Sequence, residues 1–130
     1  MVLRFIDGTQ AKPGTTILIN GEPYTVRSND ISKTGKHGAS KCRIEAVGVF
    51  VDKKKIVAVP GSERFDVPNI DKKRVQILNM SGDLVTVMDL ESYETIDIQF
   101  HENIRNVIAP EKYGEMWIVE EKKMLMRVTN

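Results

Sequence analysis

The chain has 130 residues, of which 41% are hydrophobic and 28% are charged, and its formal net charge is +1. This balance is typical of a folded globular protein and argues against an intrinsically disordered chain. Because no run of about 18 apolar residues is present, no membrane-spanning helix is predicted. The first residues also lack the charged, apolar and cleavage regions of a secretory signal, so we expect a cytoplasmic protein.

Cysteine and histidine are too sparse for a disulfide or a zinc site. Cys42 is the only cysteine, and the two histidines, His37 and His101, lie far apart in the sequence. Cys42 alternates with polar neighbours as in a strand, which predicts a buried apolar position rather than a reactive thiol. We therefore expect neither a metal nor a cofactor in this chain.

The two halves of the chain differ in charge. Residues 1–68 carry eleven Lys or Arg and seven Asp or Glu, whereas residues 69–130 carry eight and eleven. An excess of cations favours phosphate-bearing partners, so the first half is the better candidate for contact with nucleic acid. The difference is modest and does not identify a partner by itself.

Short apolar runs that alternate with period two predict an all-β chain. The first hairpin is expected where residues 15–19 and 24–27 flank Asn20-Gly21, which is a strong hairpin-turn signal. Further strands are expected through Ile31 and over residues 42–50 and 55–59. The first half should therefore contain about five strands.

A domain boundary is expected near residue 69. Residues 60–69 contain two prolines and a glycine, which do not continue a central strand. This divides the chain into residues 1–69 and 70–130. Phe65 and Val67 are still expected to pack on the first domain.

The second half repeats the strand pattern. A short helix or turn is expected over residues 101–108, and Tyr113-Gly114 is expected to interrupt it before the next strand begins. Strands are predicted over residues 74–78, 84–88, 95–100, 117–119 and 124–128. Five strands with one helical interruption fit an OB-type barrel.

The aromatic residues of this half bear on its partners. OB-type barrels bind single strands through stacking aromatics and basic grooves, and Tyr93, Tyr113 and Trp117 are available. Trp117 lies in an apolar run, which favours a core position. Because the half is net acidic, we expect contact with ribosomal protein or limited contact with RNA.

The most specific segment is the loop over residues 32–41, which places a lysine between two glycines. Gly35 and Gly38 allow backbone conformations that other residues rarely adopt, so Lys36 and His37 are expected at the tip of a tight loop. Composition alone indicates only a solvated turn. The string itself is more informative.

The string Lys33-Thr34-Gly35-Lys36-His37-Gly38 resembles the modification loop of the archaeal and eukaryotic translation initiation factor 5A family, relatives of bacterial elongation factor P. The following Ala39-Ser40-Lys41 departs from the eukaryotic pattern and looks like an archaeal variant. The resemblance implies an N-terminal SH3-like barrel that carries the loop, followed by a C-terminal OB-fold barrel.

The resemblance also implies a modification. Lys36 would receive an aminobutyl group from spermidine and become deoxyhypusine, which hydroxylation converts into hypusine. The transfer belongs to a separate NAD-dependent enzyme, deoxyhypusine synthase. Because the archaeal variant differs beyond Gly38, the hydroxylation step stays open.

The implied function is in translation. The factor would bind the ribosome beside the acceptor end of peptidyl-tRNA and promote peptide-bond formation at stalled sites such as consecutive prolines. Lys33, Lys41 and Arg43 are candidates for contact with RNA phosphates, and each is equally well explained as a solvated surface charge. His37 is a candidate for stacking on a base or for a simple turn role.

Two other functions differ from this one in class. An enzyme is not expected, because a phosphate-binding loop ending at Lys36 would need glycine at position 30 and Ser or Thr at position 37, where Asp30 and His37 stand. An unmodified two-barrel RNA-binding or transcription-elongation module explains the folds and the charge. It does not explain the string from Lys33 to Gly38.

Overall fold

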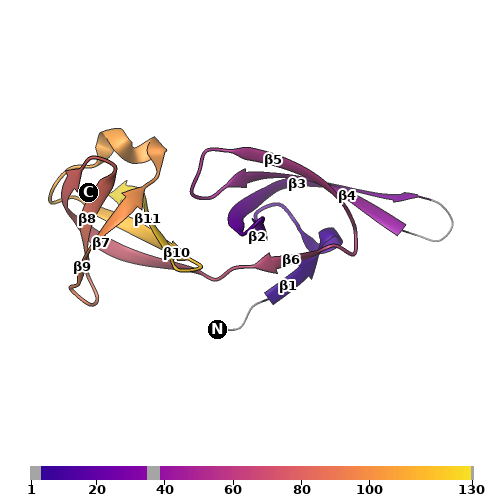
Figure 1. Cartoon of the computed structure of the whole chain (residues 1–130), viewed down its shortest axis with the longest axis horizontal. Helices are drawn as coiled ribbons and strands as arrows, with labels where there is room; N and C mark the ends of the chain where they lie inside the picture. Colours follow the sequence, from indigo (N-terminus) through magenta and orange to yellow (C-terminus); the bar gives the residue numbers. More distant parts are fainter. Residues whose placement is uncertain (1–3, 35–38, 130) are drawn as a thin grey trace. The chain divides into compact units, whose positions relative to one another are not determined.

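The computed structural model describes residues 4–34 and 39–129. The chain divides into two compact units, Met1–Pro68 and Asn69–Asn130 (Figure 1). Both are built almost entirely of strands, which confirms the all-β prediction. Within the described ranges, no helix has the length and apolar character needed to cross a membrane.

The first unit is an SH3-like barrel made of two sheets. The strands β2, β3, β4 and β5 form a four-stranded antiparallel sheet, and β1 pairs with β6. The elements are β1 (Arg4–Asp7), the 3₁₀ helix η1 (Gly8–Gln10), β2 (Thr16–Ile19), β3 (Glu22–Thr34), β4 (Ala39–Gly48), β5 (Lys54–Pro60) and β6 (Arg64–Val67).

The hairpin predicted at Asn20-Gly21 is confirmed. Both residues have a positive φ, 53° for Asn20 and 80° for Gly21, as the tight turns between antiparallel strands require. After this turn, β3 continues much further than the separate strands that were expected. A β-bulge between Val26 and Ser28 inserts one residue, so the alternation shifts while pairing with β4 continues.

The strands β1 and β6 were not predicted. Residues 60–69 were expected not to continue a central strand. The prolines stand only near the ends of this segment, and the four residues of β6 between them pair with β1 in a two-stranded sheet. Phe65 and Val67 of β6 lie in the core of the first unit, as expected. The pairing brings together segments about 60 residues apart, which no local pattern reveals.

The core of the first unit follows the alternation of its strands. Along β4, Cys42, Ile44 and Ala46 are buried and the residues between them point outward. Burial therefore confirms the prediction for Cys42, and it raises the pKa of the Cys42 thiol, with a smaller contribution from the charge of Asp7. The cluster comprises Ala11, Ile17, Ile19, Tyr24, Val26, Cys42, Ile44, Ala46, Phe65 and Val67.

The second unit is a closed five-stranded barrel with the strand order β10-β11-β9-β8-β7, in which β11 runs parallel to β9. This arrangement is the predicted OB fold. Its elements are β7 (Ile70–Ser81), β8 (Leu84–Asp89), β9 (Thr95–Phe100), the 3₁₀ helix η2 (Glu102–Val107), β10 (Tyr113–Val119) and β11 (Lys122–Thr129).

Two predictions for β10 are wrong. Tyr113-Gly114 is not an interruption before the strand, because both residues already lie in β10 and Gly114 is buried. A Cβ at Gly114 would stand 2.5 Å from the carbonyl oxygen of Arg127, so this glycine permits close strand packing. Trp117 is not in the core either. Since Gly114 and Met116 point into the barrel, Trp117 lies on the outer face and is half-buried.

Candidate functional site

The β3–β4 hairpin carries the segment that the sequence singled out. Its strands pair from Tyr24 and Gly48 to Thr34 and Ala39, which are the last paired residues. Residues 35–38, with the predicted site residues Gly35, Lys36, His37 and Gly38, lie outside the described residues. The structure therefore shows the two strands that lead into and out of the predicted site (Figure 1).

The hairpin is supported on a second side by β5. The pairing of β4 with β5 extends from Val47 and Lys54 to Lys41 and Pro60. One residue further, the backbone N–H of Gly61 donates to the carbonyl oxygen of Ser40, with 2.8 Å between nitrogen and oxygen. Strand β4 is thus hydrogen-bonded to neighbouring segments on both sides as far as Ser40, two residues after position 38. We call this part of the hairpin its base.

The turn after β5 packs closely on this base. A Cβ built at Gly61 would stand 2.8 Å from the Cβ of Ser40 and 2.9 Å from Cγ2 of Thr9. Real Cβ atoms do not approach other atoms this closely, so only glycine fits without displacement of Ser40 or Thr9. The segment around η1, the end of β5 and the start of β4 therefore pack closely against one another.

Asn29 ties the same region to β3. Its side-chain nitrogen Nδ2 donates to the carbonyl oxygens of Gly8, at 2.8 Å, and Ala11, at 3.0 Å. The helix η1 between them is closed by a capping box, in which the Asp7 carboxylate accepts from the N–H of Gln10 and the Gln10 side chain accepts from the N–H of Asp7. An asparagine inside a strand pattern was the only sequence signal for this anchor, and it was missed.

The structure separates the three predicted phosphate contacts. Lys41 and Arg43 are exposed and two residues apart on β4, so they share the outer face of the sheet. Lys33 is also exposed, but it pairs with Ser40 and so belongs to the opposite face. Lys41 and Arg43 can therefore meet one partner together, and Lys33 cannot join them on that face.

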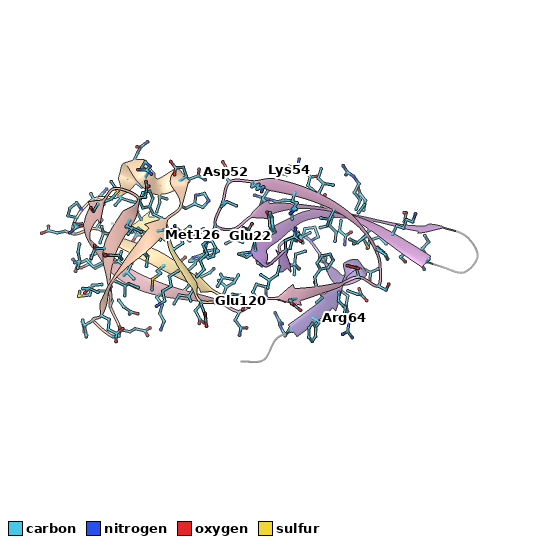
Figure 2. The ribbon with its side chains drawn as sticks, viewed as in Figure 1. Glu22, Asp52, Lys54, Arg64, Glu120 and Met126 are labelled. Atoms are coloured by element: carbon cyan, nitrogen blue, oxygen red, sulfur yellow. The ribbon has the colours of Figure 1, made fainter. Side chains whose placement is uncertain are left out.

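An ion pair lies next to these cations on the outer face. Lys54 of β5, labelled in Figure 2, forms a salt bridge with Glu45 of β4. The hydrogen bond from Lys54 is the main cause that lowers the pKa of Glu45 below its ordinary value, and Ser28 and the charge of Arg43 contribute. Glu45 is thus already partnered and stays ionised at neutral pH.

Two depressions flank the base of the hairpin. One, of about 340 Å³, lies between residues 7–9, 39–40 and 60–62, and the other, of about 380 Å³, lies between residues 39–41 and 58–60. They arise where segments distant in the sequence meet, so no sequence signal could have indicated them. Among residues 4–34 and 39–129, no group of three or more His, Cys, Asp or Glu is placed to hold a metal.

Comparison with known proteins relates this architecture to one family. Residues 6–63 match the family model described as translation initiation factor 5A-like, N-terminal. Translation initiation factor 5A of Pyrobaculum aerophilum is 36% identical over 131 residues, which cover 98% of this chain and 95% of the relative. The chain belongs to the translation initiation factor 5A family. It is accordingly a translation factor.

Other members of the family support this assignment. Translation initiation factor 5A of Thermococcus onnurineus is 43% identical over 100 residues, which cover 77% of this chain and 74% of the relative. The solved structure of the factor from Methanococcus jannaschii superposes with a TM-score of 0.83 at 31% identity, covering 99% of this chain and 100% of that one. A structure from Naegleria fowleri, at 23% identity and a TM-score of 0.80 over the full length of both chains, supports the fold alone.

Proposed function

We propose that this translation initiation factor 5A family member binds the ribosome beside the acceptor end of peptidyl-tRNA. There it promotes peptide-bond formation at stalled sites, such as consecutive prolines, through a deoxyhypusine or hypusine side chain at Lys36. The observation that carries the proposal is the β3–β4 hairpin, which is paired up to Thr34 and Ala39 and so brackets the family string at residues 33–38.

The modification would change what Lys36 can reach. An unmodified lysine is a compact cation on a four-carbon stem, which gives little reach or geometric specificity. The aminobutyl group adds a secondary and a primary amine, and both are expected to be cationic near neutral pH by analogy with lysine. The side chain becomes a tethered polyamine that suits a narrow space lined by RNA phosphates.

The proposed effect is positional. Proline is a poor partner in peptide transfer because its φ is fixed and its amine is secondary. A factor that holds peptidyl-tRNA in a reactive orientation accelerates the reaction without making a bond itself. Each tenfold gain in rate corresponds to about 1.4 kcal/mol, which a few charge-assisted hydrogen bonds can supply.

The packed base of the hairpin supports such a role. A positioning side chain is effective only when its backbone is held firmly, and β4 is bonded on both sides as far as Ser40. Lys41 and Arg43 share an exposed face next to this segment, where they can meet phosphates of the tRNA or of ribosomal RNA. Deoxyhypusine synthase, with spermidine and NAD, is the proposed partner for the modification.

The first test is the mass of the protein purified from its own cells, followed by fragmentation of the peptide that contains Lys36. An aminobutyl increment on Lys36 is the expected result, and an additional oxygen would identify hypusine. An unmodified Lys36 in native material would contradict the polyamine mechanism and favour an unmodified two-barrel RNA-binding module.

The second test is activity. In a reconstituted translation reaction on a message with consecutive prolines, the modified protein should accelerate synthesis and the Lys36→Arg variant should not, because arginine cannot receive the aminobutyl group. Lys33→Arg serves as the matched control and should retain the effect. Equal stimulation by Lys36→Arg would exclude the modified side chain as the active group.

A further inference from the structure

The outer face of β7, β10 and β11 in the second unit combines cations with aromatic rings. Its positions alternate with residues that point into the barrel, such as Val75, Gly114 and Met116. We name it the basic–aromatic face and define it by Lys72 and Arg74 of β7, Tyr113, Glu115 and Trp117 of β10, and Arg127 of β11.

Rings and cations are paired on this face. The Nζ of Lys72 lies 4.4 Å from the centroid of the Trp117 ring, and the guanidinium carbon of Arg74 lies 5.2 Å from the centroid of the Tyr113 ring. The indole N–H of Trp117 donates to the carboxylate of Glu115 over 2.7 Å, which orients the ring. Both rings are half-buried, so each is partly open at the surface.

The charge of the face is opposite to that of its unit. Residues 69–130 hold eight Lys or Arg and eleven Asp or Glu. The basic–aromatic face has three cations, Lys72, Arg74 and Arg127, against the single carboxylate of Glu115. The remaining surface of the unit is therefore distinctly acidic, and the positive charge is gathered where the rings are.

The opposite side of the barrel has a different chemistry. OB folds commonly bind oligonucleotides across their second and third strands, which here are β8 and β9. The outward positions of these strands are Leu84, Thr86, Met88, Thr95, Asp97 and Gln99, which include neither a cation nor an aromatic ring. This face does not suit a polyanion.

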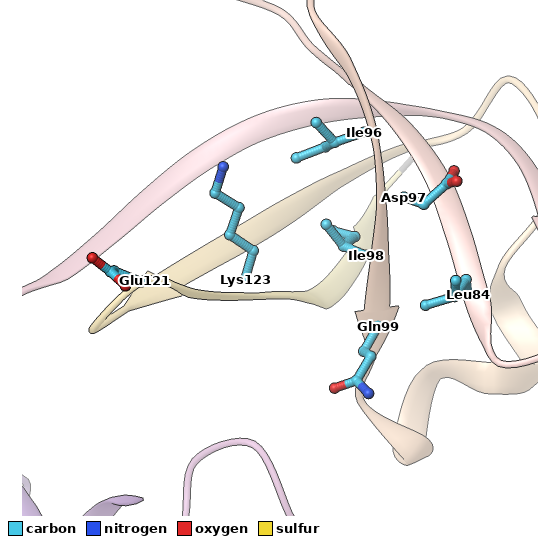
Figure 3. A pocket seen from close by; sticks show the side chains of 7 residues that line it. All are labelled: Leu84, Ile96, Asp97, Ile98, Gln99, Glu121 and Lys123. Carbon is cyan, nitrogen blue, oxygen red and sulfur yellow. The ribbon is translucent and has the colours of Figure 1, made fainter. Parts of the chain in front are cut away.

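The seam between β9 and β11 is no better suited to binding a polyanion. The two strands pair only at Gln99 and Phe100 of β9, and beside this short pairing lies a shallow depression of about 330 Å³ (Figure 3). Its charged lining consists of Asp97, Glu121 and Lys123, with more negative than positive charge. The ring of Phe100 on β9 is buried in the core, and the exposed ring of Tyr93 lies in the turn between β8 and β9. The outward faces of β8 and β9 and their seam with β11 therefore offer no exposed ring on which a base could stack.

We propose that the basic–aromatic face binds single-stranded RNA, with bases stacked on Trp117 and Tyr113 and phosphates bound by Lys72, Arg74 and Arg127. Stacking of a base on a ring is stronger than an exposed contact between a cation and a ring, so a base can displace the Lys72 or Arg74 side chain toward a phosphate. A single strand is required because the bases of a duplex are stacked on each other. This binding goes beyond the role proposed for Lys36 and does not depend on it.

Tryptophan fluorescence tests the proposal directly, because Trp117 is the only tryptophan in the chain. The full-length protein is titrated with an unstructured RNA of about ten nucleotides, within the span of an OB fold. We expect saturable quenching with the single strand, and little quenching with inorganic polyphosphate or with an RNA duplex. Absence of quenching by the single strand, or equal quenching by polyphosphate, would overturn the proposal.

Two double variants distinguish RNA binding at this face from a general effect of charge. Arg74→Ala combined with Arg127→Ala should weaken RNA binding about tenfold and reduce the slope of log affinity against log salt by about 1.4. The control combines Lys73→Ala with Lys123→Ala, which removes the same charge from positions of β7 and β11 that do not belong to the face, and it should leave affinity nearly unchanged. An equal loss in both variants would show that only total charge matters.

Thermal unfolding checks that the variants are folded. The fluorescence test on the unmutated protein does not depend on the folding of any variant. Lys36→Ala should leave the quenching of Trp117 unchanged while it abolishes the stimulation of translation. If Lys36→Ala removed the quenching, the RNA would be held by the lysine loop and the inference for the second unit would be wrong.

Discussion

Asn29 on β3 donates its side-chain amide to the carbonyl oxygen of Gly8, 2.8 Å away, and so joins η1 to the strand that leads toward residues 35–38. The same nitrogen also donates to the carbonyl oxygen of Ala11. Both carbonyls belong to buried residues, where a missing donor is costly. A single side chain therefore satisfies two backbone groups at the base of the candidate site.

Replacement of Asn29 by alanine should lower the free energy of unfolding by about 1–2 kcal/mol. The carbonyl oxygen of Ala11 loses its donor, and that of Gly8 keeps only the longer bond of 3.4 Å from the N–H of Ala11. Urea unfolding of the variant and of the unmutated protein measures the difference. Ser32→Ala, at an exposed position of the same strand, is the control and should change stability little. A similar small change for Asn29→Ala would show that the two hydrogen bonds contribute little.

Gly61→Ala should destabilise the first unit by about 1–3 kcal/mol through overpacking. The new Cβ would stand 2.8 Å from the Cβ of Ser40, and Thr9 blocks the other side. Combination with Ser40→Gly removes one of these contacts and should recover part of the loss, which a double-mutant cycle detects. Purely additive effects in the cycle would contradict the close contact between residues 40 and 61.

The salt bridge between Glu45 and Lys54 should make stability depend on pH in the acidic range. The pKa of Glu45 is lower in the folded protein than its ordinary value of 4.5, so its contribution is fully present above about 4.5 and is lost as the pH falls through the folded value. Lys54→Met should therefore destabilise the protein at neutral pH and lose this effect well below pH 4.5. Denaturation at the two pH values measures the difference.

The control for the salt bridge is Lys53→Met, which removes the same charge from the neighbouring residue. It should show a smaller destabilisation, without the same dependence on pH. If both variants behaved alike, the effect would come from overall charge rather than from the contact with Glu45.

Cys42 should react slowly with thiol reagents in the folded protein. Burial raises the pKa of its thiol, so little of the reactive thiolate is present near neutral pH, and the side chain is only 2% exposed. The rate of reaction with an aromatic disulfide, with and without denaturant, tests this. Rapid reaction of the native protein would contradict the buried position.

Lys41 and Arg43 should act together in translation. The double variant Lys41→Ala with Arg43→Ala is expected to lower the factor-dependent rate on consecutive prolines about tenfold, or about 1.4 kcal/mol. Lys12→Ala with Lys53→Ala removes the same charge from other exposed positions of the first unit and should have little effect. Equal losses would show that the outer face of β4 has no specific role.

Most of the fold could be predicted because its signals are local. The turn at Asn20-Gly21, the strand at Thr95–Phe100 and the alternation around Cys42 each depend on neighbouring residues, and the structure shows all three. The candidate site was indicated by a string of adjacent residues rather than by a spatial arrangement. The family assignment agrees with that string.

The missed features depend on contacts between distant parts of the chain. The pairing of β1 with β6 and the packing of Gly61 on Ser40 and Thr9 require the barrel to close first. Likewise, the apolar run around Trp117 does not tell which side of β10 faces the interior. Gly114 decides this, because its buried position against Arg127 turns the tryptophan outward.

The sequence by itself determined the all-β class, the division into two β units, the hairpin turn and the position of the candidate lysine, because these follow from short-range alternation, turn chemistry and a contiguous string. Only the tertiary structure decided which side chains share a face. The bulge after Val26 sets how β3 aligns with β4, and this alignment places Lys33 on the face opposite to Lys41 and Arg43. Barrel closure likewise gathers Lys72, Arg74 and Arg127 around two aromatic rings.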